Sequence, residues 1–184
     1  MVVACAVALV LALFGGAEPR TWQRSALWIF FLILALFIAA LALNRQIRAA
    51  WYQRYLDDPN PNRRGYAVLM LGGTELKSMV PVIVGRLDDE DPTVRKDAIL
   101  ALSTIDDPGA LPAVRAALGD EDPGVRETAV IVIVPLGRGG PEVIDDLIRM
   151  LADPDARVRD AAASGLDTLD PRWREGPDVP PAFR

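Results

Sequence analysis

Two short runs of carboxylates, Asp88–Asp91 and Asp120–Asp122, are the residues of this chain whose types best suit the binding of a cation. A calcium-binding loop alternates its oxygen ligands along the chain and has a glycine at its centre. Neither run has that spacing or that glycine. Because Asp is a preferred capping residue at the start of a helix, both runs are explained as helix caps and solvated turns. The sequence therefore predicts no metal site.

Nucleophilic and acid–base chemistry lacks its usual side chains in this chain. The 184 residues include no histidine, which removes the commonest general base and a common metal ligand. The one cysteine, Cys5, lies in an apolar segment, and Gly139-Gly140 does not follow a strand as a phosphate loop does. We therefore expect no catalytic residue, no cofactor and no enzymatic activity. The serines have neither a histidine partner nor a lysine at dyad spacing: Ser25, Ser78, Ser103 and Ser164.

The segments that carry the carboxylates repeat along the chain. Asp91-Pro92-Thr93-Val94-Arg95 recurs 31 residues later, from position 91 to position 122, as Asp122-Pro123-Gly124-Val125-Arg126. Looser copies of the surrounding pattern begin at Leu56 and Leu151. A fixed period of this length is typical of stacked structural repeats. We therefore expect repeats at residues 56–86, 87–117 and 118–150, with a partial repeat at 151–169.

Each repeat has the pattern of two antiparallel helices. Asp91 and Asp122 can accept hydrogen bonds from free amides of the first helical turn, and the proline after each needs no amide hydrogen there. Apolar residues then follow at i, i+4 and i+8, which places them on one helix face. The fold class is therefore expected to be all-α. The apolar residues at these positions are Val94, Ala98 and Leu102 in one repeat, and Val125, Ala129 and Ile133 in the next.

These residues resemble the HEAT-repeat family, and more narrowly the short HEAT-like repeats also found in phycobilin lyases. The resemblance covers about Leu56 to Leu169 and rests on the tandem Asp-Pro-x-Val-Arg signature. It implies a short α-solenoid of about four helix pairs, with atypical end repeats. It also implies an internal ladder in which arginines pair with Asp side chains of adjacent repeats. The arginines of this ladder are Arg95, Arg126 and Arg159, beside the capping residues Asp91, Asp122 and Asp155.

An apolar region precedes the repeats. Ser25–Leu43 has 19 residues without a charged side chain, and at about 1.5 Å per residue it covers roughly the hydrocarbon thickness of a bilayer. Met1–Ala17 is also apolar, and it forms either the first helix of a transmembrane hairpin or a cleaved signal peptide. No positively charged region precedes it, which favours the hairpin. We therefore expect residues 1–43 to contain two transmembrane helices.

Charge divides the rest of the chain. Residues 44–64, here called the basic collar, hold five Arg and two Asp, whereas residues 65–184 hold 13 Lys+Arg against 22 Asp+Glu. The acidic balance of the repeats excludes nucleic acid as the main partner, because phosphate binding needs a basic footprint. The collar carries more positive charge than Arg20 and Arg24 on the other side of Ser25–Leu43. This predicts an integral protein of the cell membrane whose repeat domain lies in the cytoplasm. Residues 44–55 are expected to extend the second membrane helix, and 170–184 to form a Pro-rich tail.

The sequence favours a membrane-anchored scaffold or adaptor that binds another protein on the cytoplasmic side. Two other functions remain open. One is a chromophore-lyase-like role, suggested by the related repeats, and the other is a small subunit of a membrane transport or secretion complex. Solenoid repeats bind along extended surfaces, and we expect the second helices to form that surface here. The candidate contact residues are Lys77, Arg86, Arg115, Asp145, Asp146 and Arg149.

Overall fold

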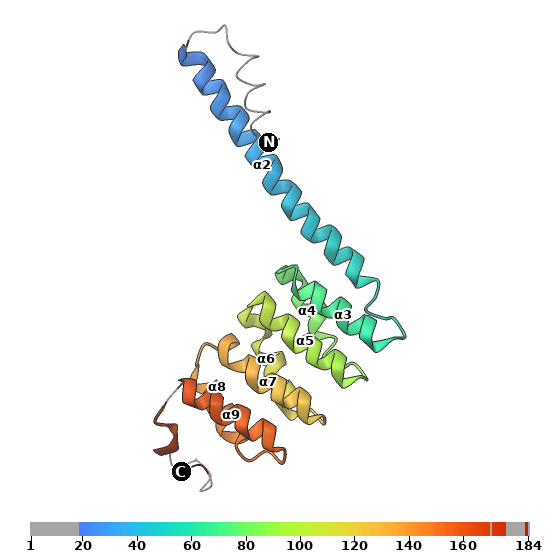
Figure 1. Cartoon of the computed structure of the whole chain (residues 1–184), viewed down its shortest axis with the longest axis vertical. Helices are drawn as coiled ribbons and strands as arrows, with labels where there is room; N and C mark the ends of the chain where they lie inside the picture. The colour runs from blue at the N-terminus through green and yellow to red at the C-terminus, as the bar shows by residue number, and fades with distance from the viewer. Residues whose placement is uncertain (1–18, 170, 176–182, 184) are drawn as a thin grey trace. The chain divides into compact units, whose positions relative to one another are not determined.

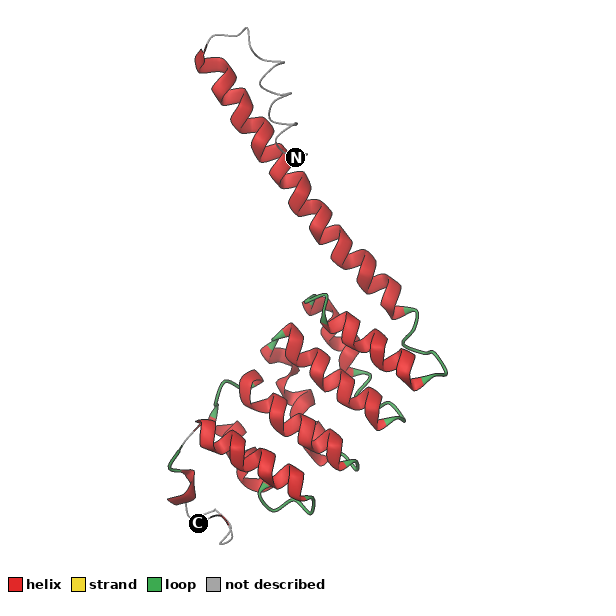
Figure 2. Cartoon of the chain, in the orientation of Figure 1, coloured by secondary structure: helices red, strands yellow, loops and turns green. Residues whose placement is uncertain are grey.

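The computed structural model describes residues 19–169, 171–175 and 183, and the regular structure in these residues is helical (Figure 2). The chain divides into two compact units at Asn44 and Arg45. The apolar segment Met1–Ala17, with Cys5, lies outside the described residues, so the expected first membrane helix does too. Most of the expected tail, 170–184, also lies outside them.

Helix α2 (Pro19–Gln53) is the longest element. Its stretch Trp28–Gln53 is long and apolar enough to cross a membrane, by length and composition alone. Large apolar side chains between Trp28 and Leu43 are exposed, which distinguishes this stretch from the core helix of a globular domain. The last turns of α2, from Arg45 onward, belong to the second unit, where Ala49 is buried.

The second unit is an array of helix pairs. The first helices are α3 (Pro61–Gly72), α5 (Pro92–Ile105), α7 (Pro123–Leu136) and α9 (Ala156–Leu169), and each packs against the next in a row (Figure 1). The second helices are shorter and more varied. They comprise η1 (Lys77–Met79) with α4 (Val80–Val84), η2 (Pro108–Ala110) with α6 (Leu111–Ala116) and η3 (Ala117–Gly119), and α8 (Pro141–Met150).

Local sequence determines where the first helices begin and how closely they pack. Asn60, Asp91 and Asp122 are extended N-cap residues whose side chains accept from first-turn amides, and a proline follows each of them. Gly72 allows α3 to approach α5, since a Cβ at this position would lie 2.7 Å from the Ala101 Cα. Neighbouring first helices are therefore in near backbone contact at this point.

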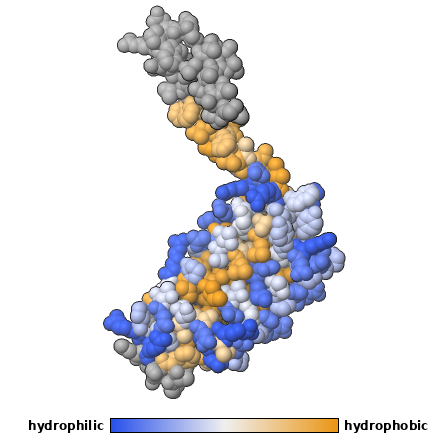
Figure 3. Space-filling view, in the orientation of Figure 1, coloured by the Kyte–Doolittle hydropathy of each residue, from blue (hydrophilic) through white to orange (hydrophobic). Residues whose placement is uncertain are grey.

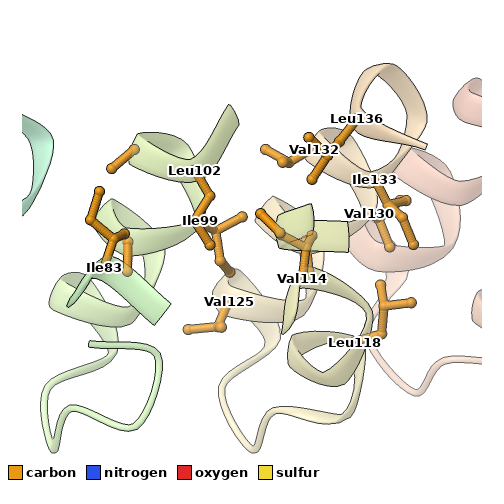
Figure 4. Close-up of a cluster of buried hydrophobic side chains, with 14 of the residues drawn as sticks. Ile83, Ile99, Leu102, Val114, Leu118, Val125, Val130, Val132, Ile133 and Leu136 are labelled. Carbon is orange, nitrogen blue, oxygen red and sulfur yellow. The ribbon is translucent and has the colours of Figure 1, made fainter. Parts of the chain in front are cut away.

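The core runs through the array between the two layers of helices (Figure 4). Val94, Ala98 and Leu102 of α5 are fully buried, as their i, i+4, i+8 spacing predicts, and they pack with Ile83 and Val114 of the second helices. At the C-terminal end, η4 (Trp173–Glu175) closes the core. Trp173 is buried and donates a hydrogen bond from Nε1 to Asp167 at 2.8 Å.

Candidate functional site

The turns that lead into the first helices share one hydrogen-bond pattern. Asp91 accepts a hydrogen bond from the Thr93 amide at 2.7 Å. Asp122 and Asp155 accept in the same way from the first turns of α7 and α9, at 2.8 and 2.9 Å. Each cap is held in turn by the carboxylate two residues earlier, as when Asp89 accepts from the Asp91 amide at 3.0 Å. The acidic runs therefore form a repeated structural turn.

In α5 and α7 one arginine joins two of these turns. Arg95 donates from Nε and Nη2 to the two carboxylate oxygens of Asp120, at 2.9 and 2.8 Å, and from Nη1 to the Asp89 carbonyl at 2.9 Å. Arg126 makes the equivalent bonds to Asp153, at 2.8 and 2.9 Å, and to the Asp120 carbonyl at 2.9 Å. Each guanidinium thus ties its own turn to the turn of the next repeat. We call these pairs the Arg–Asp ladder.

The two ends of the ladder differ from the sequence expectation. Arg64 also belongs to it, since its Nε and Nη2 donate to Asp89 at 2.9 and 2.8 Å. The signal was present, because Arg64 precedes Arg95 by the repeat period. Arg159 donates to the carbonyls of Asp153 and Pro154 in its own turn but has no carboxylate partner among the described residues. No further repeat follows it there to supply one.

Burial and pairing set the charge state of the ladder. The side chains of Arg95 and Asp120 are 8% and 12% exposed. Burial raises the pKa of Asp120, but hydrogen bonds from the Arg95 guanidinium and the Asp122 amide outweigh it and hold that pKa below its ordinary value. For Asp153 the hydrogen bond from Arg126 is the largest influence and likewise lowers the pKa. These carboxylates are ionised and fully occupied by internal partners.

Metal binding has no candidate in the region that the structure covers. No group of three or more His, Cys, Asp or Glu side chains among the described residues is arranged to hold an ion. Within the acidic runs, the Asp120 carboxylate accepts from Arg95 and from the Asp122 amide.

The second helices place the six predicted contact residues in unlike surroundings. Lys77, Asp145 and Arg149 are exposed. Arg86 donates to the Leu56 carbonyl at 3.2 Å and is only partly exposed. Arg115 and Asp146 pair with each other.

Asp146 is a correction to the expected contact surface. Its side chain is 1% exposed, and it accepts hydrogen bonds from Arg115, with Nη2 at 3.2 Å, and from Arg149. Asp146 follows the buried Val143 by three residues and therefore lies on the same face of α8. Its carboxylate joins α6 to α8 and is not available to a partner.

The outer surface of the first helices carries exposed apolar side chains. Leu100 of α5 and Ile131 of α7 occupy equivalent repeat positions and are 43% and 57% exposed. A shallow cavity of about 320 Å³ adjoins Ile131 and is lined by Pro135 of α7 and Gly165 of α9. Figure 3 shows an apolar patch over α5 and α7 on this side. We call the surface around Leu100 and Ile131 the apolar face.

A known family matches most of the second unit. The model of a family described as HEAT repeats matches residues 49–134 and 112–182, which is more than half of the chain. The chain belongs to the HEAT-repeat family. This confirms the family inferred from the tandem signature, and it makes the second unit a helical-repeat scaffold of a kind that commonly mediates protein interaction. No curated protein matches the chain.

The HEAT match begins within the last turns of α2, where aromatic rings gather. Trp51 lies 6.1 Å from Tyr55 between ring centroids, and Tyr52 lies 6.2 Å from Tyr66. With Arg63 they line a cavity of about 450 Å³, here called the aromatic hollow. Tyr66 reaches these rings from a separate helix, α3, so its place in the hollow is not visible in the sequence.

Proposed function

We propose that this HEAT-repeat protein is a membrane-anchored scaffold whose apolar face binds a protein partner on the cytoplasmic side. The observation that carries the proposal is the exposure of Leu100 and Ile131 at equivalent positions of neighbouring helices. Contiguous apolar surface on a folded protein is typical of an interaction site, whereas single exposed residues are not.

The geometry of the two helix layers supports the apolar face over the second helices. Helices α5 and α7 each have 14 residues, whereas α4 has five and α6 has six. Long parallel helices offer a continuous surface, while the short helices offer turns. The charges of the second layer are also partly satisfied within the array, as for Asp146.

The anchor in this proposal is the apolar stretch of α2. Ser25–Leu43 has the length of a membrane span, and the arginines of the basic collar follow it. Positive charge on that side favours the cytoplasm for everything that follows. The repeats contain neither histidine nor cysteine, so we propose binding and not catalysis as the activity.

Sidedness is tested with one engineered cysteine. In a Cys5→Ser background, Ser164→Cys places a thiol on an exposed position of α9. We expect a membrane-impermeant maleimide to label it only after the membrane has been permeabilised. Labelling of intact cells would overturn the cytoplasmic assignment.

The partner surface is tested by paired variants of the full-length chain in native membranes. Leu100→Asp with Ile131→Asp should lower crosslinked partner recovery by at least about tenfold, the effect of losing about 1.4 kcal/mol of binding energy. The control, Lys77→Asp with Asp145→Lys, keeps the net charge and alters exposed second-helix residues. Quantitative mass spectrometry of crosslinked complexes gives both values. If only the control variant lost the crosslinked partner, the interface would have to be assigned to the second helices.

A further inference from the structure

The aromatic hollow presents an apolar surface that the fold leaves open. Trp51 is 54% exposed and Tyr66 is 57% exposed, although both have ring neighbours within the second unit. Tyrosine and tryptophan rings combine an apolar body with a polar edge, which suits the boundary between lipid and water. The side chains of the hollow are therefore suited to a ligand that is itself amphipathic.

The surroundings of the hollow are cationic. Arg54 lies 5.7 Å from the centre of the Trp51 ring, and Arg63 lines the cavity. Arg48 and Arg54 are exposed and have no carboxylate partner among the described residues. The Arg54 charge therefore remains uncompensated beside the Trp51 ring, and Arg48 precedes Trp51 by three residues in the same helix.

The two carboxylates of the basic collar do not cancel these charges. Asp57 pairs with Arg86 at 3.0 Å, outside the collar. Asp58 accepts from the Asn60 amide at 2.9 Å and pairs with Arg63 at 3.3 Å. Both acidic groups are therefore engaged, and the rim presents net positive charge to an incoming ligand.

We propose that the aromatic hollow binds an anionic phospholipid of the cytoplasmic leaflet. The rings contact the glycerol and upper acyl region, and Arg54 with Arg48 attracts the phosphate. This rests on the proposed membrane anchor, because Trp51 follows Leu43 by eight residues, about two helical turns. Continuity with the apolar stretch and the positive rim favour a lipid over an acidic protein segment.

The experiment measures lipid retention by the full-length chain. The protein is purified in a non-ionic detergent and delipidated, and dioleoyl-phosphatidylglycerol or dioleoyl-phosphatidylcholine is added. Native mass spectrometry then counts bound lipid molecules. We expect the anionic lipid to be retained at least about fivefold better, the factor that corresponds to one arginine near an anionic surface.

Two variants assign that preference to the hollow. Arg48→Gln with Arg54→Gln and Tyr66→Ala removes both cations and one ring, and it should retain both lipids equally. The control, Arg138→Gln with Tyr66→Phe, removes an exposed cation elsewhere and keeps the ring, and it should behave as wild type. Equal loss in both variants would overturn the proposal, as would equal retention of the two lipids by the wild-type chain.

Competition separates a lipid from a small anion or a protein. Glycerol 3-phosphate, which has the phosphate but no acyl chain, should not displace the lipid, and displacement would overturn the lipid assignment. Displacement by an acidic peptide at equal concentration would assign the hollow to a protein partner instead. Carbonate extraction of native membranes tests the anchor separately. Release of the wild-type chain would refute the membrane span, whereas retention of the variant with an altered lipid preference supports both proposals.

Discussion

The two sides of the helical array use charged residues differently. At the turns between repeats, one arrangement of Arg and Asp recurs three times with nearly the same distances. Along the second helices, each ion pair is unlike the others. The recurring pairs are Arg64–Asp89, Arg95–Asp120 and Arg126–Asp153, and the individual pairs are Arg86–Asp57 and Arg115–Asp146.

Helix length accounts for the difference. The first helices are nearly constant in length and pack side by side in a row, so the turns at their N-termini line up and can share one contact. The second helices range from five residues in α4 to ten in α8, so equivalent positions face different neighbours. Periodic contacts thus come from periodic sequence, and individual contacts come from local packing.

Arg126→Ala should give the largest loss of stability. It leaves the Asp153 carboxylate, 4% exposed, without its guanidinium partner, and stranding a buried charge costs about 3 kcal/mol. Thermal unfolding of the full-length chain in non-ionic detergent, followed by circular dichroism, measures the effect. The control Arg138→Ala removes a 68% exposed guanidinium and should change stability by less than about 0.5 kcal/mol. Equal midpoints for the two variants would show that the ladder is not stabilising.

Acid should weaken the ladder in a defined direction. The folded pKa values of Asp120 and Asp153 lie below their unfolded values, so their contribution is present above the unfolded pKa of about 3.9 and is lost as pH falls through the folded pKa. Asp153→Asn should therefore be less stable than wild type at pH 7, by about 1–2 kcal/mol. The difference should shrink below about pH 4 in denaturant titrations. A difference that grows in acid would contradict the pairing.

Asp146→Asn should have the smallest effect of the three. Asp146 is buried, but its partners Arg115 and Arg149 have side chains 37% and 68% exposed. Because water can solvate both guanidiniums after the change, we expect a loss of about 1 kcal/mol. Denaturant titration at pH 7 gives the value. A loss as large as that of Arg126→Ala would show that this second-helix ion pair stabilises the fold as much as a ladder pair does.

The periodic features of this structure could be predicted from the sequence. The tandem signature indicates the HEAT-repeat family, and the i, i+4, i+8 pattern predicts the buried residues of α5 and α7. Arg64 was not predicted as a ladder member, because Asn60 and Arg63 replace signature residues and conceal its register. Its backbone position still imposes the contact, since its guanidinium bonds Asp89 as Arg95 bonds Asp120.

Contacts that depend on how neighbouring helices pack could not be predicted from the sequence. Asp145 and Asp146 are adjacent and chemically identical, yet the first is exposed and the second is buried. Only the rotation of α8 against its neighbours separates them. Tyr66 joins the aromatic hollow for the same kind of reason, because α3 folds back beside the end of α2. The amino-acid pattern specifies each helix but not these side-chain contacts between helices.

The Arg–Asp ladder has a direction and two unlike ends. Each guanidinium reaches forward along the chain to the next turn. Within the described residues, Asp58 therefore has no arginine from an earlier repeat, and Arg159 has no later carboxylate. Every junction between them uses the same residue types at the same positions. The ladder therefore fixes the spacing of neighbouring repeats and leaves their number open. Duplication of one repeat in the gene adds one junction and disturbs none, which lets a protein of this kind lengthen during evolution one helix pair at a time.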